Sequence, residues 1–353
     1  MNAPILPIRL NRRQALTAAL GTLGGMIIGG STMLTSRRTH TSFSDGSAAI
    51  APSLLPRTEH RSFASGLLRR AMSYYVYQPP GYEASSPALY PVLYMLHGSG
   101  GGSTEWASYG LLVEADRLMQ RGEIPAFLIV LPEGDRAYWV DHANGGPAWG
   151  TYMAREVVAE IEGHFRVRVG RAHRAIGGLS MGAHGALQLA LNFPGTFGVA
   201  GAHTPVLRTY AQAPAYFGSR AYFAAHTPVN LVRAHPDVAR SLVIWIDIGA
   251  QDPWFTKARA FPEELIALRV PHAWHVYPGG HTGSYWAAHV PDYLRFYGAA
   301  LGARQGNRPK DGARARRRDG VGKINGCKIP QVIENWCGYA RECSSLRSGK
   351  MES

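Results

Sequence analysis

The segment Gly178–Gly182, "GLSMG", matches the pattern G-x-S-x-G, in which a serine between two glycines can act as a nucleophile. An apolar strand-like run at 174–179 precedes Ser180, and an Ala/Leu-rich helix-like run at 181–192 follows it. A serine on such a sharp turn is lifted toward a base, and the N–H of Met181 at the helix start can stabilise an oxyanion. We therefore predict that Ser180 is a nucleophile; a glycine-rich turn without chemistry is the alternative.

A serine nucleophile needs a base, and the base needs an acid that orients it. "SLVIWIDIGAQDPW" places Asp252 after an apolar strand, and "HAWHVYPGGHTGSYW" places His281 after a strand and a Gly-Gly turn. Ser, Asp, His is one of the chain orders in which this triad occurs. We predict that Asp252 holds the imidazole of His281, which moves the proton. Asp247 is the competing acid, but it lies within the apolar strand, where an unpaired carboxylate is costly.

The glycine-rich loop in "YMLHGSGGG" follows another apolar strand and leaves backbone N–H groups free to bind an oxyanion. The N–H groups of residues 99–102 are candidates for the second donor, beside that of Met181. His97 ends the strand and is expected to brace the loop rather than to act as the base. Gly100 and His184 are candidate substrate-binding residues, although a helix-packing role for His184 is equally consistent with the sequence.

Metal and cofactor motifs are absent from the sequence. It contains no H-E-x-x-H, and Cys327, Cys337 and Cys343 all lie near the C-terminus at spacings of ten and six. "GSGGG" lacks the Lys-Ser/Thr of a phosphate loop. We predict no metal and no cofactor. Among the other histidines, His275 alternates along a strand and His289 falls on the last helix, so we interpret both as packing residues.

Strand-like and helix-like segments alternate from about residue 61 to residue 301. Strands are predicted at 72–78, 90–96, 127–132, 174–180, 197–203, 241–249 and 272–278, and helices at 109–120, 151–165, 181–192, 257–268 and 285–297. Runs such as "LVIWIDIG" are apolar nearly throughout, as in parallel strands covered on both faces. This predicts a mostly parallel α/β sheet. The aromatic, Pro-rich segment 203–241 is either a side wall over the site or an ordinary surface excursion.

The formal charge of +13 is concentrated at the two ends of the chain. Residues 1–72 and 302–353 carry +7 each, whereas residues 73–301 carry −1. Because the central part has no basic excess, we expect no nucleic-acid partner.

The N-terminal segment has the features of an export signal. Arg12 and Arg13 precede an apolar run from Ala15 to Leu34, which resembles a twin-arginine signal. An uncleaved membrane anchor is the alternative. In both cases we expect an extracytoplasmic, bacterial protein.

We accordingly divide the chain into four parts and leave the oligomeric state open. They are a signal or anchor at 1–40, a linker at 41–60, a catalytic domain at 61–301 and a basic tail, expected to be disordered, at 302–353.

Six blocks, in order, resemble the esterase D family of α/β hydrolases, which includes feruloyl and acetylxylan esterases, formylglutathione hydrolases and mycolyltransferases. The blocks are "YVYQPPGYE", "YPVLYMLHGSGGG" with Trp106, "LPEGDRAYWVDHANGGPAWGTYMAREVVAEIEGHFRV", "RAIGGLSMGAHGALQLAL", "IDIGAQDPW" and "YPGGHTGSYW". The resemblance covers about two thirds of the chain and implies an α/β-hydrolase fold. It also implies Ser180, Asp252 and His281 as the triad and the backbone N–H groups of Ser99 and Met181 as the oxyanion hole. Trp106 becomes a third candidate substrate-binding residue. Ala183 and His184 depart from the family pattern and leave the shape of the acyl pocket open.

The function that we predict is that of an exported serine esterase acting on a small-molecule or polysaccharide-linked ester through an acyl-enzyme. Two alternatives remain at this point: transfer of the acyl group to a sugar or lipid alcohol, and a non-catalytic binding protein that keeps the scaffold.

Overall fold

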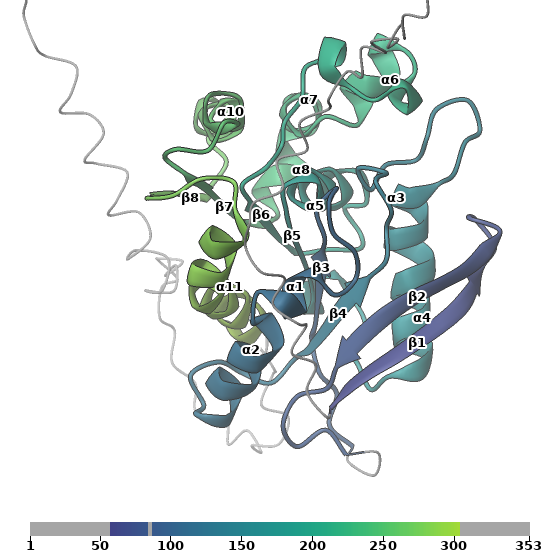
Figure 1. Cartoon of the computed structure of the whole chain (residues 1–353), viewed down its shortest axis with the longest axis vertical. Helices are drawn as coiled ribbons and strands as arrows, with labels where there is room; N and C mark the ends of the chain where they lie inside the picture. The colour runs from purple at the N-terminus through teal and green to yellow at the C-terminus, as the bar shows by residue number, and fades with distance from the viewer. Residues whose placement is uncertain (1–56, 84–86, 304–353) are drawn as a thin grey trace, which may run out of the picture. The chain divides into compact units, whose positions relative to one another are not determined.

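One sheet runs through the part of the chain that the computed structural model describes, residues 57–83 and 87–303 (Figure 1). Within these residues its eight strands have the order β1-β2-β4-β3-β5-β6-β7-β8. The strands are β1 (Thr58–Ser65), β2 (Arg70–Tyr77), β3 (Val92–Leu96), β4 (Leu128–Pro132), β5 (Arg174–Leu179), β6 (Val199–His203), β7 (Val243–Gly249) and β8 (Ala273–Tyr277). All neighbours from β4 to β8 pair in parallel, and only the two pairings of β2 are antiparallel.

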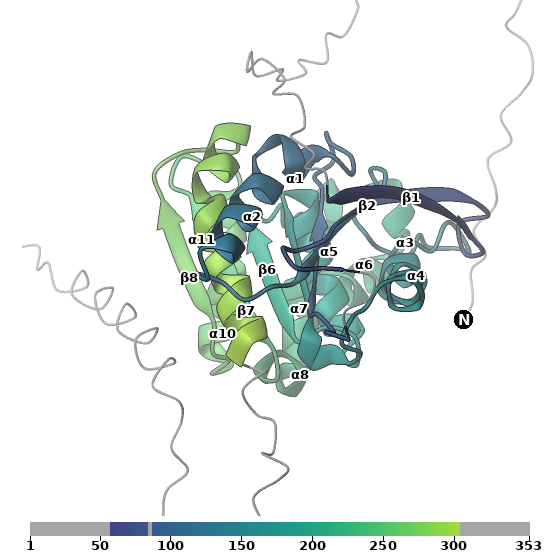
Figure 2. The same ribbon diagram turned by 90° about the horizontal axis from the view of Figure 1, so that it is seen from below.

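Helices cover both faces of this sheet. They are α1 (Glu105–Ser108), α2 (Leu111–Gln120), α3 (Trp149–Thr151), α4 (Val158–His164), α5 (Met181–Asn192), α6 (Arg220–Ala225), α7 (Pro228–Ala234), α8 (Pro236–Arg240), α9 (Phe255–Ala258), α10 (Ala260–Ala267) and α11 (Gly283–Ala303). Leu93 and Met95 of β3 pack with α2 and α11, which lie together in Figure 2. Val92 and Tyr94 pack on the opposite side, with α4, α5 and α7. The predicted mostly parallel sheet with helices on both faces is confirmed.

The structure differs from the predicted elements at three places. It contains β1, which the sequence analysis does not predict and which begins before residue 61. This edge strand pairs only with β2 and is exposed at alternate positions. Its residues are therefore mostly polar and lack the apolar run by which the other strands are predicted. A π-helical turn over Tyr152–Val157 interrupts the helix predicted at 151–165. The segment 203–241 forms short helical turns and α6 to α8.

The parallel strands bring the carboxyl ends of β3, β5, β6, β7 and β8 to one edge of the sheet. In sheets of this kind the loops at that edge carry the ligand-binding groups. The residues after these strands therefore meet at one place, although they are distant in the sequence.

Candidate active site

Ser180 occupies the turn between β5 and α5. Its φ of 55° and ψ of −113° put a non-glycine residue at positive φ, which costs free energy. A Cβ on Gly178 would lie 2.4 Å from the backbone of Gly182, and a Cβ on Gly182 would lie 2.4 Å from the carbonyl oxygen of Leu96. The two glycines of the motif thus allow α5 to begin against β5 and the end of β3.

Because the backbone at Ser180 is strained, Ser180→Gly is expected to stabilise the protein. Relief of strain worth about 1–3 kcal/mol should exceed the entropy of the more flexible unfolded chain, for a net gain of about 1 kcal/mol. Urea unfolding measures this effect. Ser180→Ala is the matched control, since it also removes the hydroxyl but keeps the Cβ; equal stabilities of the two variants would contradict strain at this turn.

His281 and Asp252 continue from Ser180 in one hydrogen-bonded chain. The Oγ of Ser180 lies 2.9 Å from Nε2 of His281, and Nδ1 of His281 lies 2.7 Å from Oδ2 of Asp252. The Asp252 side chain is fully buried and accepts the N–H of Trp254 at 2.8 Å through its other oxygen. This geometry favours the tautomer with a proton on Nδ1, which leaves Nε2 free to accept the serine proton.

Two backbone N–H groups near Ser180 correspond to the predicted oxyanion donors. Met181 is the first residue of α5, so its N–H has no carbonyl four residues earlier in the helix to bind. Ser99 is exposed and follows Gly98, whose Cβ position would lie 3.4 Å from the Cβ of Ser180. The exposed Gly100 comes next along the same loop. Gly98 thus places the loop that carries Ser99 against the nucleophile.

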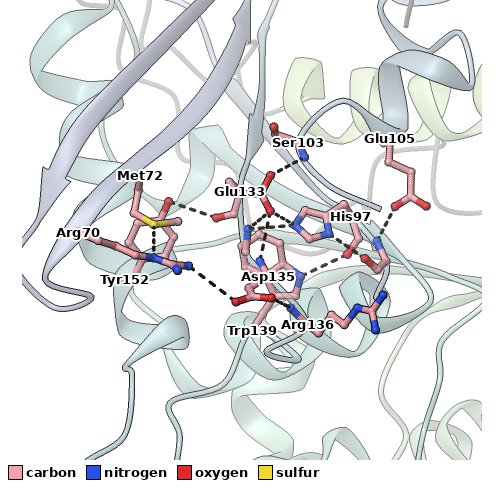
Figure 3. Close-up of polar contacts among 12 residues, drawn as sticks. Arg70, Met72, His97, Ser103, Glu105, Glu133, Asp135, Arg136, Trp139 and Tyr152 are labelled. Carbon is pink, nitrogen blue, oxygen red and sulfur yellow. Dashed lines mark hydrogen bonds and ion pairs between the residues drawn. The ribbon is translucent and has the colours of Figure 1, made fainter. Parts of the chain in front are cut away.

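Glu105 is a site residue that the sequence analysis missed. Its Oε2 accepts the N–H of Gly98 at 2.7 Å (Figure 3). Its Oε1 accepts the Tyr109 hydroxyl at 3.2 Å. Burial raises the pKa of this carboxyl, although the Gly98 N–H and the nearby histidines partly oppose the shift. Glu105 thereby fixes the loop that carries Ser99. The sequence signal that could have identified Glu105 is its position, as an acidic residue directly after the glycine-rich loop.

His97 braces the same loop from the other side, as Figure 3 shows. Its buried ring contacts the carbonyl oxygen of Gly98 through Nδ1 at 2.8 Å and the N–H of Gly134 through Nε2 at 2.9 Å. Nε2 also lies 3.3 Å from Oε1 of Glu133, and Oε2 of Glu133 accepts the N–H of Ser103 at 3.0 Å. One carboxylate therefore joins the end of β4 to the loop after β3.

Glu133 has a strongly shifted acidity. Burial alone would raise its pKa, but His97 and the backbone N–H groups of Ser103 and Asp135 outweigh burial and lower the pKa to about 2. A carboxyl with a lowered folded pKa stabilises the fold above its unfolded pKa, and this contribution is lost as the pH falls toward the folded value.

Glu133→Gln is therefore expected to destabilise the protein at pH 7, with a difference from wild type that shrinks from about pH 4.5 toward pH 2. Urea unfolding at several pH values checks this. Glu263→Gln is the matched control, because it removes an exposed carboxylate paired with Arg259. A wild-type advantage over Glu133→Gln that is the same at pH 3 and pH 7 would contradict the assignment.

The structure corrects the substrate-binding role of Trp106. This side chain is 1% exposed, and its Nε1–H donates to the carbonyl oxygen of Leu96 at 3.0 Å. Its ring packs edge-on against His203 and Tyr293. Trp106 thus supports the end of β3 from within the core. An aromatic residue after a glycine-rich loop gives the same sequence pattern whether it faces the ligand or the core.

His184 is also a packing residue, which was the alternative left open. It is 1% exposed, contacts the carbonyl oxygen of His226 through Nε2 at 3.0 Å, and packs edge-on against Tyr138 and Phe217. Burial lowers its pKa to about 4, so the ring is neutral at ordinary pH. Its neighbour Ala183 is fully buried. His184 therefore joins α5 to the segment before α7.

Asp247, the competing acid, belongs to a separate buried network. Four groups donate to its fully buried carboxylate: Nδ1 of His203 at 2.7 Å, Nε1 of Trp245 at 2.8 Å and the hydroxyls of Tyr285 and Tyr293 at 2.9 Å each. The carboxylate is buried but fully partnered. His275 and His289 pack on Trp245 and Tyr277, in agreement with their predicted roles.

The described residues, 57–83 and 87–303, hold neither a metal-binding cluster nor a membrane-spanning helix. They contain no cluster of three His, Cys, Asp or Glu side chains that could hold a metal ion. No helix among them has the length and apolar character needed to span a bilayer. Three predicted parts lie wholly or mostly outside the described residues: the signal or anchor at 1–40, residues 41–56 of the linker, and residues 304–353 of the cysteine-bearing tail predicted at 302–353. Gly302 and Ala303 belong to α11 and not to the tail.

The chain matches a family model described as "Putative esterase" over residues 65–297. It is 28% identical over 240 residues to an esterase of Mycobacterium tuberculosis, with 58% of this chain and 51% of that protein covered. It thus spans about half the length of that relative. It is 26% identical over 269 residues to the S-formylglutathione hydrolase of Paracoccus denitrificans, with 69% and 92% covered.

Solved structures give the same result. A ferulic acid esterase is similar with a TM-score of 0.63 and 26% identity, over 69% of this chain and 98% of that one. An S-formylglutathione hydrolase from Agrobacterium tumefaciens shares the fold, with a TM-score of 0.60, 22% identity, and 69% of this chain and 95% of that one covered. The predicted α/β-hydrolase fold and esterase D resemblance are confirmed. With well over half of its length matched by the family model, the chain belongs to this esterase family of the α/β hydrolases.

Proposed function

We propose that this protein is a serine esterase that hydrolyses carboxylic esters through Ser180, His281 and Asp252. The observation that carries the proposal is the continuous chain of contacts from Ser180 Oγ to His281 Nε2 at 2.9 Å and from His281 Nδ1 to Asp252 at 2.7 Å. Nucleophile, base and orienting acid stand in the order that acyl transfer requires. Relatives that include esterases, a ferulic acid esterase and S-formylglutathione hydrolases support an ester or thioester as substrate.

Acylation would proceed in two steps. Ser180 Oγ attacks the ester carbonyl while its proton passes to His281 Nε2, and the carbonyl oxygen becomes an oxyanion bound by the N–H groups of Met181 and Ser99. The C–O bond to the alcohol then breaks, and the imidazolium of His281 returns the proton to the leaving oxygen. Asp252 stabilises this imidazolium through Nδ1–H, so an acyl-enzyme on Ser180 and a free alcohol result.

Deacylation would repeat the same steps with water. His281 removes a proton from a water molecule, the hydroxide adds to the acyl carbon, and the oxyanion again occupies the Met181 and Ser99 donors. Collapse of this second intermediate breaks the bond to Ser180 Oγ, which regains its proton from His281. The carboxylic acid leaves, and the enzyme returns to its starting state.

We also propose that the protein is exported and acts outside the cytoplasm. Support comes from the sequence alone, where Arg12 and Arg13 precede the apolar run Ala15–Leu34. Fractionation of cells that produce the full chain, with Arg12 and Arg13 changed to lysine as the comparison, tests the location. Accumulation of the wild-type chain in the cytoplasm would overturn it.

The test of the enzymatic proposal is hydrolysis of a panel of nitrophenyl esters that vary in acyl chain, together with acetylated xylan and a feruloyl ester. A fluorophosphonate probe should label Ser180 covalently, and Ser180→Ala should abolish both the labelling and the turnover. Turnover that survives unchanged in Ser180→Ala would overturn the proposal.

A further inference from the structure

Arg208 lies in the loop after β6, and the start of this loop contacts the backbone of the nucleophile. Two residues before it, the N–H of Val206 donates to the carbonyl oxygen of Ser180 at 3.2 Å. Arg208 is partly exposed. The sequence analysis left this segment, 203–241, as either a side wall over the site or a surface excursion.

Two aromatic rings hold the guanidinium of Arg208. Its centre lies 5.0 Å from the ring of Trp254 and 5.5 Å from the ring of Tyr138, and its Nε donates to the Tyr138 hydroxyl at 2.6 Å. Such cation–π contacts fix the orientation of the planar group but leave its outer N–H groups available. Arg208 is therefore a positioned cation and not a freely moving side chain.

Both aromatic residues contact groups in or next to the catalytic residues. The N–H of Trp254 donates to Asp252 at 2.8 Å. Tyr138 packs on His184 at 5.3 Å between ring centroids, and the N–H of His184 lies 3.3 Å from the carbonyl oxygen of Ser180. The guanidinium is thus held between the loop that carries the acid and the helix that begins at the nucleophile.

The charge of Arg208 has no acidic partner. Among the described residues no carboxylate lies within 4.0 Å of this guanidinium, and only its Nε makes a hydrogen bond to a protein group. A second cation, Nζ of Lys257, lies 4.9 Å from the same Trp254 ring and is bonded to the neutral amide of Gln212 at 2.7 Å. The Asp252 carboxylate is fully buried and accepts hydrogen bonds from His281 and from the N–H of Trp254. Two cations thus lie at the Trp254 ring, and neither forms an ion pair with a described carboxylate.

We propose that Arg208 forms an anion subsite beside Ser180, and that the esters this protein prefers carry a carboxylate within reach of that side chain. The proposal rests on the proposed esterase function and names its substrate class. The paired N–H groups of a guanidinium bind a carboxylate with two parallel hydrogen bonds, which gives both affinity and orientation. Bound in this way, the carboxylate would supply the counter-ion that the protein itself lacks.

Two matched pairs of esters test the proposal and show which part of the substrate carries the charge. 4-Acetoxybenzoate and its methyl ester differ by a charge on the leaving group; the mono-4-nitrophenyl ester of adipic acid and 4-nitrophenyl hexanoate differ by a charge on the acyl chain. The measured quantity is the ratio of kcat/KM for the charged ester to that for its neutral match. Comparing the ratio between variants cancels the intrinsic reactivity of each ester.

In Arg208→Gln the ratio should fall about tenfold or more for at least one pair, mainly through KM. Arg220→Gln is the control, because Arg220 belongs to the same segment and also stacks on one ring, Tyr210 at 4.8 Å, but is exposed; its ratio should stay at the wild-type value. Arg208→Lys keeps the charge without the planar fork and should give an intermediate ratio. Thermal unfolding shows whether each variant is folded.

Equal ratios in wild type and Arg208→Gln for both pairs would overturn the subsite. If neither Arg208 variant folds, the wild-type salt dependence decides: kcat/KM should fall with salt more steeply for a charged ester than for its neutral match, and equal slopes overturn the proposal. These results are separate from the esterase proposal, which fails only if hydrolysis of the neutral esters survives in Ser180→Ala.

Discussion

Replacement of His281 by alanine should lower kcat for a nitrophenyl ester by about 10⁴- to 10⁶-fold. Without this ring, Ser180 has no base at 2.9 Å to accept its proton and no acid to protonate the leaving alcohol. The oxyanion donors remain and should sustain a small residual rate. Steady-state and single-turnover kinetics measure the loss, and a urea unfolding curve close to that of wild type would show that the fold is intact.

The double variant Ser180→Ala/His281→Ala distinguishes a working triad from two independent contributions. If serine and histidine act as a unit, the double variant should be no slower than the slower single variant, because each change alone already disables proton transfer. His164→Ala is the matched control, since His164 is exposed on α4, and its kcat should equal that of wild type. Losses that multiply in the double variant would contradict the triad.

Asp252→Asn should lower kcat by about 10⁴-fold, since an amide can hold the ring in the wrong tautomer. Asp252 contacts Nδ1 of His281 at 2.7 Å and thereby sets which ring nitrogen carries the proton. A loss of less than about tenfold would point to another acid.

The sequence was sufficient to predict the three residues that the structure brings together at Ser180. Each of them follows a strand with a strong apolar signal, and parallel strands end at the same edge, so chain order alone predicts that they meet. Asp252 was preferred to Asp247 because of its place after the strand, and the structure joins Asp252 to His281. Local pattern and topology supplied this part of the site.

Side-chain direction was outside the reach of the sequence. Trp106 stands next to the oxyanion loop in the chain but points into the core, and His184 stands one helical turn after Ser180 but packs on Tyr138. Arg208 has no motif, because the rings that hold it come from loops about 70 and 46 residues away in the chain. Such contacts depend on tertiary packing, which periodicity does not encode.

Asp247 shows the same limit in energetic terms. An unpaired carboxylate within an apolar strand is costly, but Asp247 is fully partnered. Its four donors come from His203 on the neighbouring strand β6, from Trp245 two residues earlier on β7, and from Tyr285 and Tyr293 on α11. No pattern within β7 indicates that these groups converge on one carboxylate.

Asp247→Ala is therefore expected to lower the free energy of unfolding by about 3–5 kcal/mol, the largest stability effect that we predict. The change leaves four buried donors without an acceptor, among them Tyr293. Burial, the largest cause of the raised pKa of Tyr293, persists in the variant, so the hydroxyl stays protonated and cannot ionise to relieve the loss. Urea unfolding with tryptophan fluorescence measures the difference from wild type.

Asp252→Ala is the matched control, because it also removes a fully buried Asp side chain. Asp247 lies on β7, and Asp252 lies in the loop that follows this strand. Its partner His281 is 21% exposed and can bind water instead, so the loss of stability should be about 1 kcal/mol. The two variants should thus separate the two networks: one change mainly affects folding and the other mainly affects kcat. If Asp247→Ala is as stable as Asp252→Ala, the Asp247 network does not stabilise the fold as we infer.

The Asp247 network should also affect catalysis. Tyr285 donates to Asp247 from the first turn of α11, and that helix begins two residues after His281. The bond thereby anchors the loop of the base to β7, the strand that leads to Asp252. A folded Asp247→Asn variant should consequently have a lower kcat with little change in KM, because the substrate contacts none of these groups while the orientation of His281 depends on them.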